Sequence, residues 1–300
     1  MASLRDIKIR IKSVASTKKI TKAMEMIAAS KMKRAQQAAL KGRPYVKKLE
    51  EMIGNLLAFS DPVLEHPFLN KREKVKNVGY IFMTSNRGLC GGFNSNIIRR
   101  MLEILRAHTS ETSVHKTKME QKELIITIGK KGRQAMERVG KAVMADFEEM
   151  TDRPTFVDTI GISRVVIDDF MSGKLDEVYM IYNHFYSALS QKPVLKKILP
   201  IEAADIAEIK TGAKILKRDY IFGQDRAQLL DELLKRYIET TVYQTVLESA
   251  ASEHSARMLA MRQASDNAAD IITNLTLHYN KARQAKITKE ILEVVSGSMN

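Results

Sequence analysis

The C-terminal quarter of this chain runs from Gln224 to Ser296 without a single glycine or proline. These two residues most often interrupt a helix, so their absence favours one unbroken helix over the whole stretch. At about 1.5 Å per residue, such a helix is roughly 110 Å long. A compact domain cannot enclose a rod of this length, and we expect much of the helix to project.

A heptad repeat in the same stretch indicates that the projecting helix has a partner. Met261, Ala268, Leu275 and Ala282 follow one another at intervals of seven residues, with Ile272 and Tyr279 along the other edge of the seam. Such a repeat is typical of a coiled coil. The simplest partner is a helix at the other end of the chain, running antiparallel. Because the seam is rich in small and polar residues, we expect part of its surface to be available to another protein.

The N-terminal segment shows a helical stripe that we expect to change course. Its apolar positions recur at spacings of three and four through Leu4, Ile7, Ile11 and Val14. The same line continues into polar residues (Lys18, Thr21, Glu25), so we expect a neighbouring line to take over. That line contains Ile20, Met24 and Ile27, followed by Ala28, Met32, Ala35 and Ala39.

Gly42 and Pro44 are expected to interrupt this helix, because proline removes a helical hydrogen bond. A further apolar stripe follows, and "SDPVLEHP" is expected to end the helical region near Ser60. The stripe consists of Leu49, Met52, Ile53, Leu56 and Leu57.

Between the terminal helices, short β-rich runs alternate with helical patterns. This alternation predicts an α/β layer with a mainly parallel sheet. We therefore expect an α/β protein that combines a long antiparallel coiled coil with a Rossmann-like domain, divided as residues 1–60, 74–222 and 224–297. "VLKKILPI" and "KRDYIFG" are expected to add edge strands, and "AHTSETSVHKTKMEQ" to form a surface loop. The strand patterns are "NVGYIFMTS", "ELIITIG", "AVMADF" and "DEVYMIYNHFYS"; the helical ones are "SNIIRRMLEILRAH", "KKGRQAMERV" and "GISRVVIDDFMSG".

A glycine-rich turn, "SNRGLCGGFNSN", follows the first expected strand. A phosphate-binding P-loop requires a lysine after its glycines, but Phe93 follows Gly88, Gly91 and Gly92 here. The glycine spacing also differs from that of a dinucleotide-binding fingerprint. We interpret these glycines as a structural turn, with an anion at the next helix N-terminus as the alternative.

No catalytic or metal-binding pattern accompanies this turn. The six histidines form no metal-binding pair, and Cys90 is the sole cysteine. We expect no catalysis and no cofactor. The lone cysteine and the lack of a signal peptide or a membrane-spanning run favour a cytoplasmic protein, or one that docks at a membrane.

Positive charge is concentrated near the N-terminus. The net charge is +14, and residues 1–43 contain twelve Lys/Arg against two acidic residues. Such a segment suits nucleic acid, anionic lipid or an acidic protein. A basic coiled-coil adaptor for nucleic acid or anionic membrane is therefore the alternative function, although this segment has few aromatic residues for stacking and no recognition motif.

Both ends of the chain resemble one known family. "STKKITKAMEMIAASKMKRAQ" (16–36), "SEHSARMLAMRQASDNA" (252–268) and "LTLHYNKARQAKITKEILEVVSG" (275–297) closely resemble the gamma subunit of bacterial-type F-type ATP synthases. "SNRGLCGGFN" matches the middle motif of that family. The resemblance implies an antiparallel coiled coil that projects into a ring of alternating alpha and beta subunits, and a Rossmann-like foot beside the membrane rotor. It thus implies a central rotor shaft that couples proton flow to ATP synthesis or hydrolysis.

The resemblance also implies contact residues and partners. ATP chemistry would belong to the beta subunits, and this subunit would be present as one copy at the cytoplasmic face of the cell membrane. Further partners would be the epsilon subunit and the membrane c-ring, and nucleic acid would not be one. The implied beta-subunit contacts are Met24, Arg283, Gln284, Thr288 and Glu290, and the implied contacts with acidic segments of beta are Lys18, Lys19, Lys22, Lys31 and Lys33.

Two departures from the family pattern have consequences. Asn86 stands where the family often has aspartate, which argues against an essential acid at this position. The chain also lacks the paired-cysteine insertion of the chloroplast branch, so we expect no thiol switch.

Overall fold

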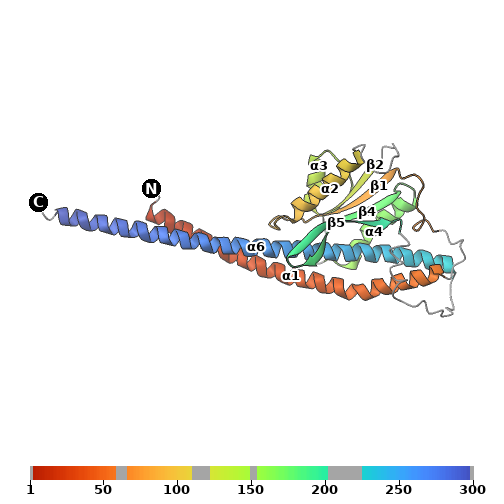
Figure 1. Cartoon of the computed structure of the whole chain (residues 1–300), viewed down its shortest axis with the longest axis horizontal. Coiled ribbons are helices and arrows are strands. Elements are labelled where there is room, and N and C mark those ends of the chain that lie inside the picture. Colours follow the sequence, from red (N-terminus) through yellow and green to blue (C-terminus); the bar gives the residue numbers. More distant parts are fainter. Residues whose placement is uncertain (1–2, 59–65, 110–121, 149–153, 202–224, 298–300) are drawn as a thin grey trace. The chain divides into compact units, whose positions relative to one another are not determined.

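The computed structural model describes residues 3–58, 66–109, 122–148, 154–201 and 225–297, with side chains up to Val294. The chain divides into two compact units (Figure 1). The first unit combines residues 1–30 with residues 257–300, and the second comprises residues 31–256. Two helices, α1 (Leu4–Ala58) and α6 (Arg226–Gly297), each contribute one stretch to each unit.

The second unit is built on a five-stranded sheet with the order β3-β2-β1-β4-β5. β1 (Asn77–Met83) pairs in parallel with both β2 (Lys122–Ile128) and β4 (Glu177–Ser187). β3 (Val143–Phe147) extends the parallel part, and β5 (Ser190–Leu199) adds an antiparallel edge through a hairpin with β4. The predicted fold class, a mainly parallel α/β sheet with long terminal helices, is therefore confirmed.

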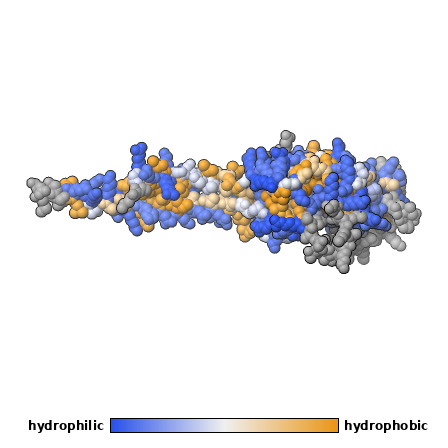
Figure 2. Space-filling view, turned by 90° about the horizontal axis from the view of Figure 1, so that it is seen from above, coloured by the Kyte–Doolittle hydropathy of each residue, from blue (hydrophilic) through white to orange (hydrophobic). Residues whose placement is uncertain are grey.

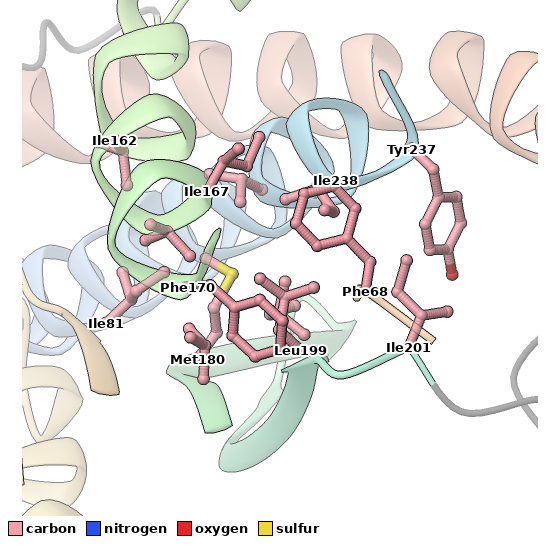
Figure 3. Packing of buried hydrophobic residues seen from close by; sticks show 14 of the residues in the cluster. Phe68, Ile81, Ile162, Ile167, Phe170, Met180, Leu199, Ile201, Tyr237 and Ile238 are labelled. Carbon is pink, nitrogen blue, oxygen red and sulfur yellow. The ribbon is translucent and has the colours of Figure 1, made fainter. Parts of the chain in front are cut away.

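Helices cover both faces of this sheet because its central strands are apolar on both sides. On one face, α2 (Phe93–Thr109) and α3 (Lys130–Arg138) pack their apolar sides against the sheet, with Met101 and Met136 fully buried. On the other face, α4 (Phe156–Met171) packs together with the second-unit stretches of α1 and α6. Figure 3 shows Phe170 of α4, Leu199 of β5 and Ile238 of α6 within this second layer.

The structure corrects the expected break near Gly42. α1 continues through both Gly42 and Pro44 and ends at Ala58. Gly42 serves a different purpose: a Cβ placed there would lie 1.8 Å from Nε2 of Gln244 on α6. The missing side chain therefore leaves room for the Gln244 side chain to lie against α1. Burial of Leu49, Ile53 and other α1 residues in the second unit outweighs the one hydrogen bond that proline removes.

Most of the expected elements are present. All four predicted strands and all three predicted inner helices appear, although α4 begins before the helical pattern proposed for it. "VLKKILPI" lies in the edge strand β5 and in the residues just after it, as predicted. "KRDYIFG" and most of the predicted loop at 107–121 lie outside the described residues.

The first unit consists of the N-terminal stretch of α1 and the C-terminal stretch of α6, which run antiparallel side by side (Figure 1). This arrangement confirms the predicted pairing of the two extremities. Within the described part of the chain, no helix is long and apolar enough to cross a membrane.

Candidate functional site

The seam on α1 runs straight, which corrects the expected change of course. Thr21 is only 9% exposed and Glu25 is half-buried, so the line that begins at Leu4 continues through two of its three polar positions, whereas Lys18 is exposed. Most of the predicted neighbouring line is buried or half-buried as expected, namely Met24, Ala28, Met32, Ala35 and Ala39, and the last four of these also lie on the straight line from Leu4. Ile20 and Ile27, which we expected in the seam, are 58% and 57% exposed. The heptad register, and not local hydrophobicity, therefore decides which residues face α6.

Thr21 and Glu25 remain in the seam because each has a hydrogen-bond partner within α1. The Thr21 hydroxyl donates to the carbonyl oxygen of Lys18 at 3.1 Å. The Glu25 side chain is only 15% exposed, and its carboxylate pairs with Nζ of Lys22 at 2.9 Å. A buried polar group that already has a partner imposes little cost on the coil, so the stripe does not need to shift.

The seam on α6 follows the predicted heptad. Met261, Ala268 and the intervening Ser265 are buried. The later members of the repeat are half-buried, which is expected for a narrow two-helix seam. These later members are Ile272, Leu275, Tyr279 and Ala282.

Beyond Ala282 the surface of α6 changes. Every residue from Arg283 to Val294 is exposed, including the four predicted contact residues Arg283, Gln284, Thr288 and Glu290. The Thr288 hydroxyl donates to the carbonyl oxygen of Gln284 at 2.9 Å, and Glu290 lies 3.5 Å from Lys286. These local contacts leave the side chains accessible to another protein.

The predicted basic residues fall in both units. Lys18, Lys19 and Lys22 are exposed in the first unit, where Met24 is half-buried. In the second unit, Lys31 is half-buried and Lys33 is exposed. The assignment of the five beta-subunit contacts and the five lysines to partner contacts stays a prediction. The division of the chain into residues 1–60, 74–222 and 224–297 also stays a prediction.

Exposed apolar residues form a group that the sequence interpretation missed. Ile20, Met26 and Ile27 on α1 are each more than half exposed, although we had expected the two isoleucines in the seam. On α6, Ile287 is 46% exposed, and four further residues are more than half exposed, namely Leu277, Ile291, Leu292 and Val294. Figure 2 shows hydrophobic and hydrophilic residues side by side along the paired helices. The strict heptad spacing of the seam, applied from Leu4 onward, was the signal that identifies which α1 residues remain outside.

The glycine-rich turn has the conformation of a tight structural turn. Leu89 and Gly91 have positive φ angles of 62° and 55°. A Cβ at Gly92 would lie 3.1 Å from the Asn96 side chain, whereas one at Gly88 would meet nothing within 4 Å. Positive φ at Gly91 and close packing at Gly92 thus account for two of the three glycines.

Polar groups of this turn are occupied by the protein itself. Asn94 Oδ1 accepts the Ser85 N–H at 3.0 Å, and Asn94 Nδ2 donates to the Ser85 hydroxyl at 2.7 Å. Asn86 uses both ends of its amide: Oδ1 accepts the Lys130 N–H, and Nδ2 donates to the Glu148 carbonyl oxygen, each at 2.9 Å. An ionised aspartate could accept the Lys130 N–H but has no donor for the Glu148 carbonyl, so asparagine is suited to connecting the ends of three strands here.

No group of three or more His, Cys, Asp or Glu side chains suited to a metal ion occurs in the part of the chain that the structure describes. What distinguishes the molecule is the first unit, a two-helix coil with a narrow seam and an unevenly charged and apolar outer surface.

Comparison with known proteins agrees with this architecture. The sequence model of a family described as ATP synthase matches residues 3–299. The ATP synthase gamma chain of Cupriavidus pinatubonensis is 42% identical over 299 residues, with 99% of each chain covered. The chain belongs to the ATP synthase gamma chain family. Gamma chains of Xanthomonas axonopodis pv. citri (43%) and Dehalococcoides mccartyi (44%) match over 99% of both chains.

Solved structures share the fold of this chain. A chain of the Euglena gracilis mitochondrial ATP synthase (OSCP/F1/c-ring, rotational state 3) aligns with a TM-score of 0.64. It is 20% identical, and the alignment covers 99% of this chain and 93% of that one. The Euglena rotor in rotational state 1 gives a TM-score of 0.60 at 19% identity, covering 95% and 98% of the respective chains. The predicted function, that of the central rotor shaft, is confirmed by the family together with this fold.

Proposed function

We propose that this chain is a non-catalytic shaft that transmits proton-driven rotation to the catalytic beta subunits of an F-type ATP synthase. The observation that best supports this proposal is the uneven surface of the first unit. Residues 1–30 contain seven basic residues against two acidic ones, whereas residues 257–300 contain six against four. The exposed apolar residues are also distributed differently on the two helices.

An uneven surface matters because rotation changes the face that each surrounding subunit meets. A face that binds one conformation of a beta subunit more tightly shifts that subunit toward it. Reversing a hundredfold preference requires about 5.5 kcal/mol of differential binding. One exposed ion pair contributes only about 0–1 kcal/mol, so many contacts along the helices are needed.

The described residues offer contacts of two kinds. Exposed lysines (Lys18, Lys19, Lys22) would pair with acidic segments of the beta subunits, in keeping with their resemblance-based assignment. Ile20 and Ile27 would add apolar contacts on the same helix. Arg283, Gln284, Thr288 and Glu290 would contact the beta subunits from α6, together with Met24 of α1.

The remaining assembly follows from the same proposal. One copy would stand within the alpha–beta ring, and the α/β unit would bind the epsilon subunit and the membrane c-ring. The chain would thereby be held at the cytoplasmic face of the cell membrane as a peripheral subunit. No step requires a cofactor on this chain, because ATP would be bound by its partners.

Cross-linking tests the shaft directly. In a complex with alpha and beta subunits, a rigid cross-link from the 283–290 stretch to a beta subunit should stop multi-turn rotation in a single-molecule assay. Cleaving the link should restore rotation. Continued rotation with a verified rigid cross-link contradicts the proposal.

Substitutions test the predicted contacts. Replacing both Arg283 and Gln284 with alanine should reduce ATP synthesis while part of the hydrolysis remains, because contacts elsewhere on the rod persist. Full synthesis in this double variant would show that these two residues are not contacts. Co-purification with alpha and beta subunits at high salt separates the shaft from the basic adaptor, whose binding to nucleic acid or anionic lipid would be lost under those conditions.

A further inference from the structure

We propose that the β4–β5 hairpin fixes the rotational angle of α6 where α6 leaves the second unit, and that it carries twisting force between the sheet and this helix. This inference rests on the proposed function. It makes Gln191 and Ser255 positioning residues for torque transfer. The clamp, as we define it, consists of Ala188 and Gln191 of the hairpin and Ser255 of α6.

The clamp is a dense set of directional contacts. The Ser255 hydroxyl donates to the carbonyl oxygen of Ala188 at 2.6 Å, and it accepts from Nε2 of Gln191 at 3.1 Å. The same Gln191 nitrogen also lies 3.0 Å from the Ala188 carbonyl oxygen and 3.2 Å from that of Ser187. Ser255 has no exposed surface, so its hydroxyl is committed to this contact. The turn is thereby fastened to α6.

A second contact lies on the same face of α6. His184 Nδ1 of β4 is 2.7 Å from Glu248 Oε2. Residues seven apart, such as 248 and 255, lie nearly above one another on a helix. Four residues of strand span about 13 Å, and seven residues of helix span about 10 Å. The end of β4 and this part of α6 therefore advance together, which places two successive contacts along one line.

A third contact holds the earlier part of α6. The guanidinium of Arg236 lies 4.4 Å from the centroid of the Phe156 ring on α4, and its Nε donates to the Tyr45 hydroxyl at 3.2 Å. Apolar packing such as that of Leu234 and Ile238 excludes water but is not directional. Hydrogen bonds and ion pairs depend on angle as well as distance. The three polar contacts therefore add an angle-dependent restraint on rotation of α6 to the steric restraint of the close-packed core.

The position of the clamp determines its importance. Ser255 lies one residue before Ala256, the last residue of the second unit, and α6 continues unbroken into the first. The clamp is thus the last of these three contacts before α6 enters the coil. On α6, twisting force applied to the sheet therefore passes this contact last, while the continuous helix α1 offers a second route.

Thermal fluctuation of a stalled complex measures the predicted stiffness. We would assemble the chain with alpha and beta subunits of the same organism, cross-link α6 to a beta subunit at Ile287→Cys, and attach a bead at Val157→Cys. Val157 is 72% exposed and distant in sequence from the clamp. The angular variance of the bead is inversely proportional to torsional stiffness.

The double variant Ser255→Ala/Gln191→Ala should increase the variance measurably, by at most about 1.5-fold, because it removes one of three polar contacts that act alongside the apolar core. Ser190→Ala is the matched control, since the Ser190 hydroxyl makes no hydrogen bond to α6 among the described residues, and its variance should equal that of the parent. Equal variance in the double variant and the parent overturns the clamp. Rotation of the parent complex without the cross-link, recorded with ATP, tests the shaft separately from the clamp.

Discussion

The two stretches of α6 have the same backbone but different surroundings. From Arg226 to Ala256 the helix contributes a broad set of buried side chains to the second unit, including Leu230, Leu234, Ile238 and Val242, all fully buried. From Arg257 to Val294 only Met261, Ser265 and Ala268 are buried. The first stretch is stabilised by a core that contacts it over a wide face, and the second by a seam. A seam leaves most of the surface available to partners.

The largest expected effect tests whether the core stretch supports the second unit. Leu234→Ala should lower the free energy of unfolding of the second unit by about 3 kcal/mol, because the substitution removes a fully buried side chain and leaves a cavity. Leu277→Ala, at a position that is 54% exposed in the first unit, should change it by less than about 0.5 kcal/mol. Urea titration followed by tyrosine fluorescence measures both values. Equal losses would remove the distinction between core and seam.

A buried carboxylate in the second unit gives the next effect. Burial alone would raise the pKa of Asp176, but hydrogen bonds from the Asn77 and Lys76 N–H groups and from Arg72 hold that pKa below its usual range. Its stabilising contribution is therefore complete above the unfolded-state pKa of about 3.9 and is lost as the pH falls toward the lower folded-state value.

Asp176→Asn should cost about 2 kcal/mol at pH 7, because one acceptor is replaced by a donor facing other donors. The difference from the parent should narrow at pH 2 to 3, where the parent also becomes protonated. Urea titrations at both pH values measure this. Asp270→Asn, on the exposed face of α6, is the control and should cost less than about 0.5 kcal/mol at pH 7. A cost for Asp176→Asn that is independent of pH would contradict the assignment.

A smaller effect concerns the contact between Gly42 of α1 and the Gln244 side chain of α6. Gly42→Ala should destabilise the second unit by about 1 kcal/mol, since a clash with Gln244 exceeds the gain in helix propensity. In a Gln244→Ala background the same change should be stabilising by up to about 1 kcal/mol. Gln244 Nε2 is buried without a hydrogen-bond partner, so its removal breaks no bond to this nitrogen. A double-mutant cycle with zero coupling would show that the two residues do not meet.

The smallest effect concerns the seam itself. Thr21→Val should stabilise the coil by about 0.5 kcal/mol, because a methyl group replaces a hydroxyl whose hydrogen bond to Lys18 lies within α1. Hydrogen exchange of the amides at residues 14–28 should slow in the full chain. Ile20→Val, which changes an exposed apolar residue, is the control and should leave exchange unchanged. Faster exchange in Thr21→Val would mean that the hydroxyl stabilises the seam.

Sequence patterns identified the elements of the second unit because buried strands and amphipathic helices have distinct periods. They were less informative where one interaction overrides a local tendency. Pro44 is a residue that typically breaks a helix. Burial of α1 residues such as Ile53 against α6 residues such as Leu234 nevertheless keeps α1 continuous. Ile20 is more hydrophobic than Thr21, yet the register set by Leu4, Ile7 and Ile11 places Thr21 inside. Hydrophobicity alone does not reveal register.

The polar contacts were the least predictable part. Ser255 and Gln191 are 64 residues apart, and no periodic pattern connects them. The same applies to Asn86, whose departure from the family pattern was visible but whose two hydrogen-bond partners were not. Such pairs depend on how strands and helices are brought together in three dimensions. The exposed contact residues of α6 came from family resemblance, because nothing in their spacing distinguishes them from other exposed positions.

The buried thiol has a practical consequence for labelling. Cys90 is the sole cysteine of the chain and is 2% exposed, with its sulfur accepting a hydrogen bond from Asn94. A water-soluble maleimide should therefore react at an engineered surface cysteine much faster than at Cys90. Fluorophores and spin labels can then be introduced one position at a time into the native background.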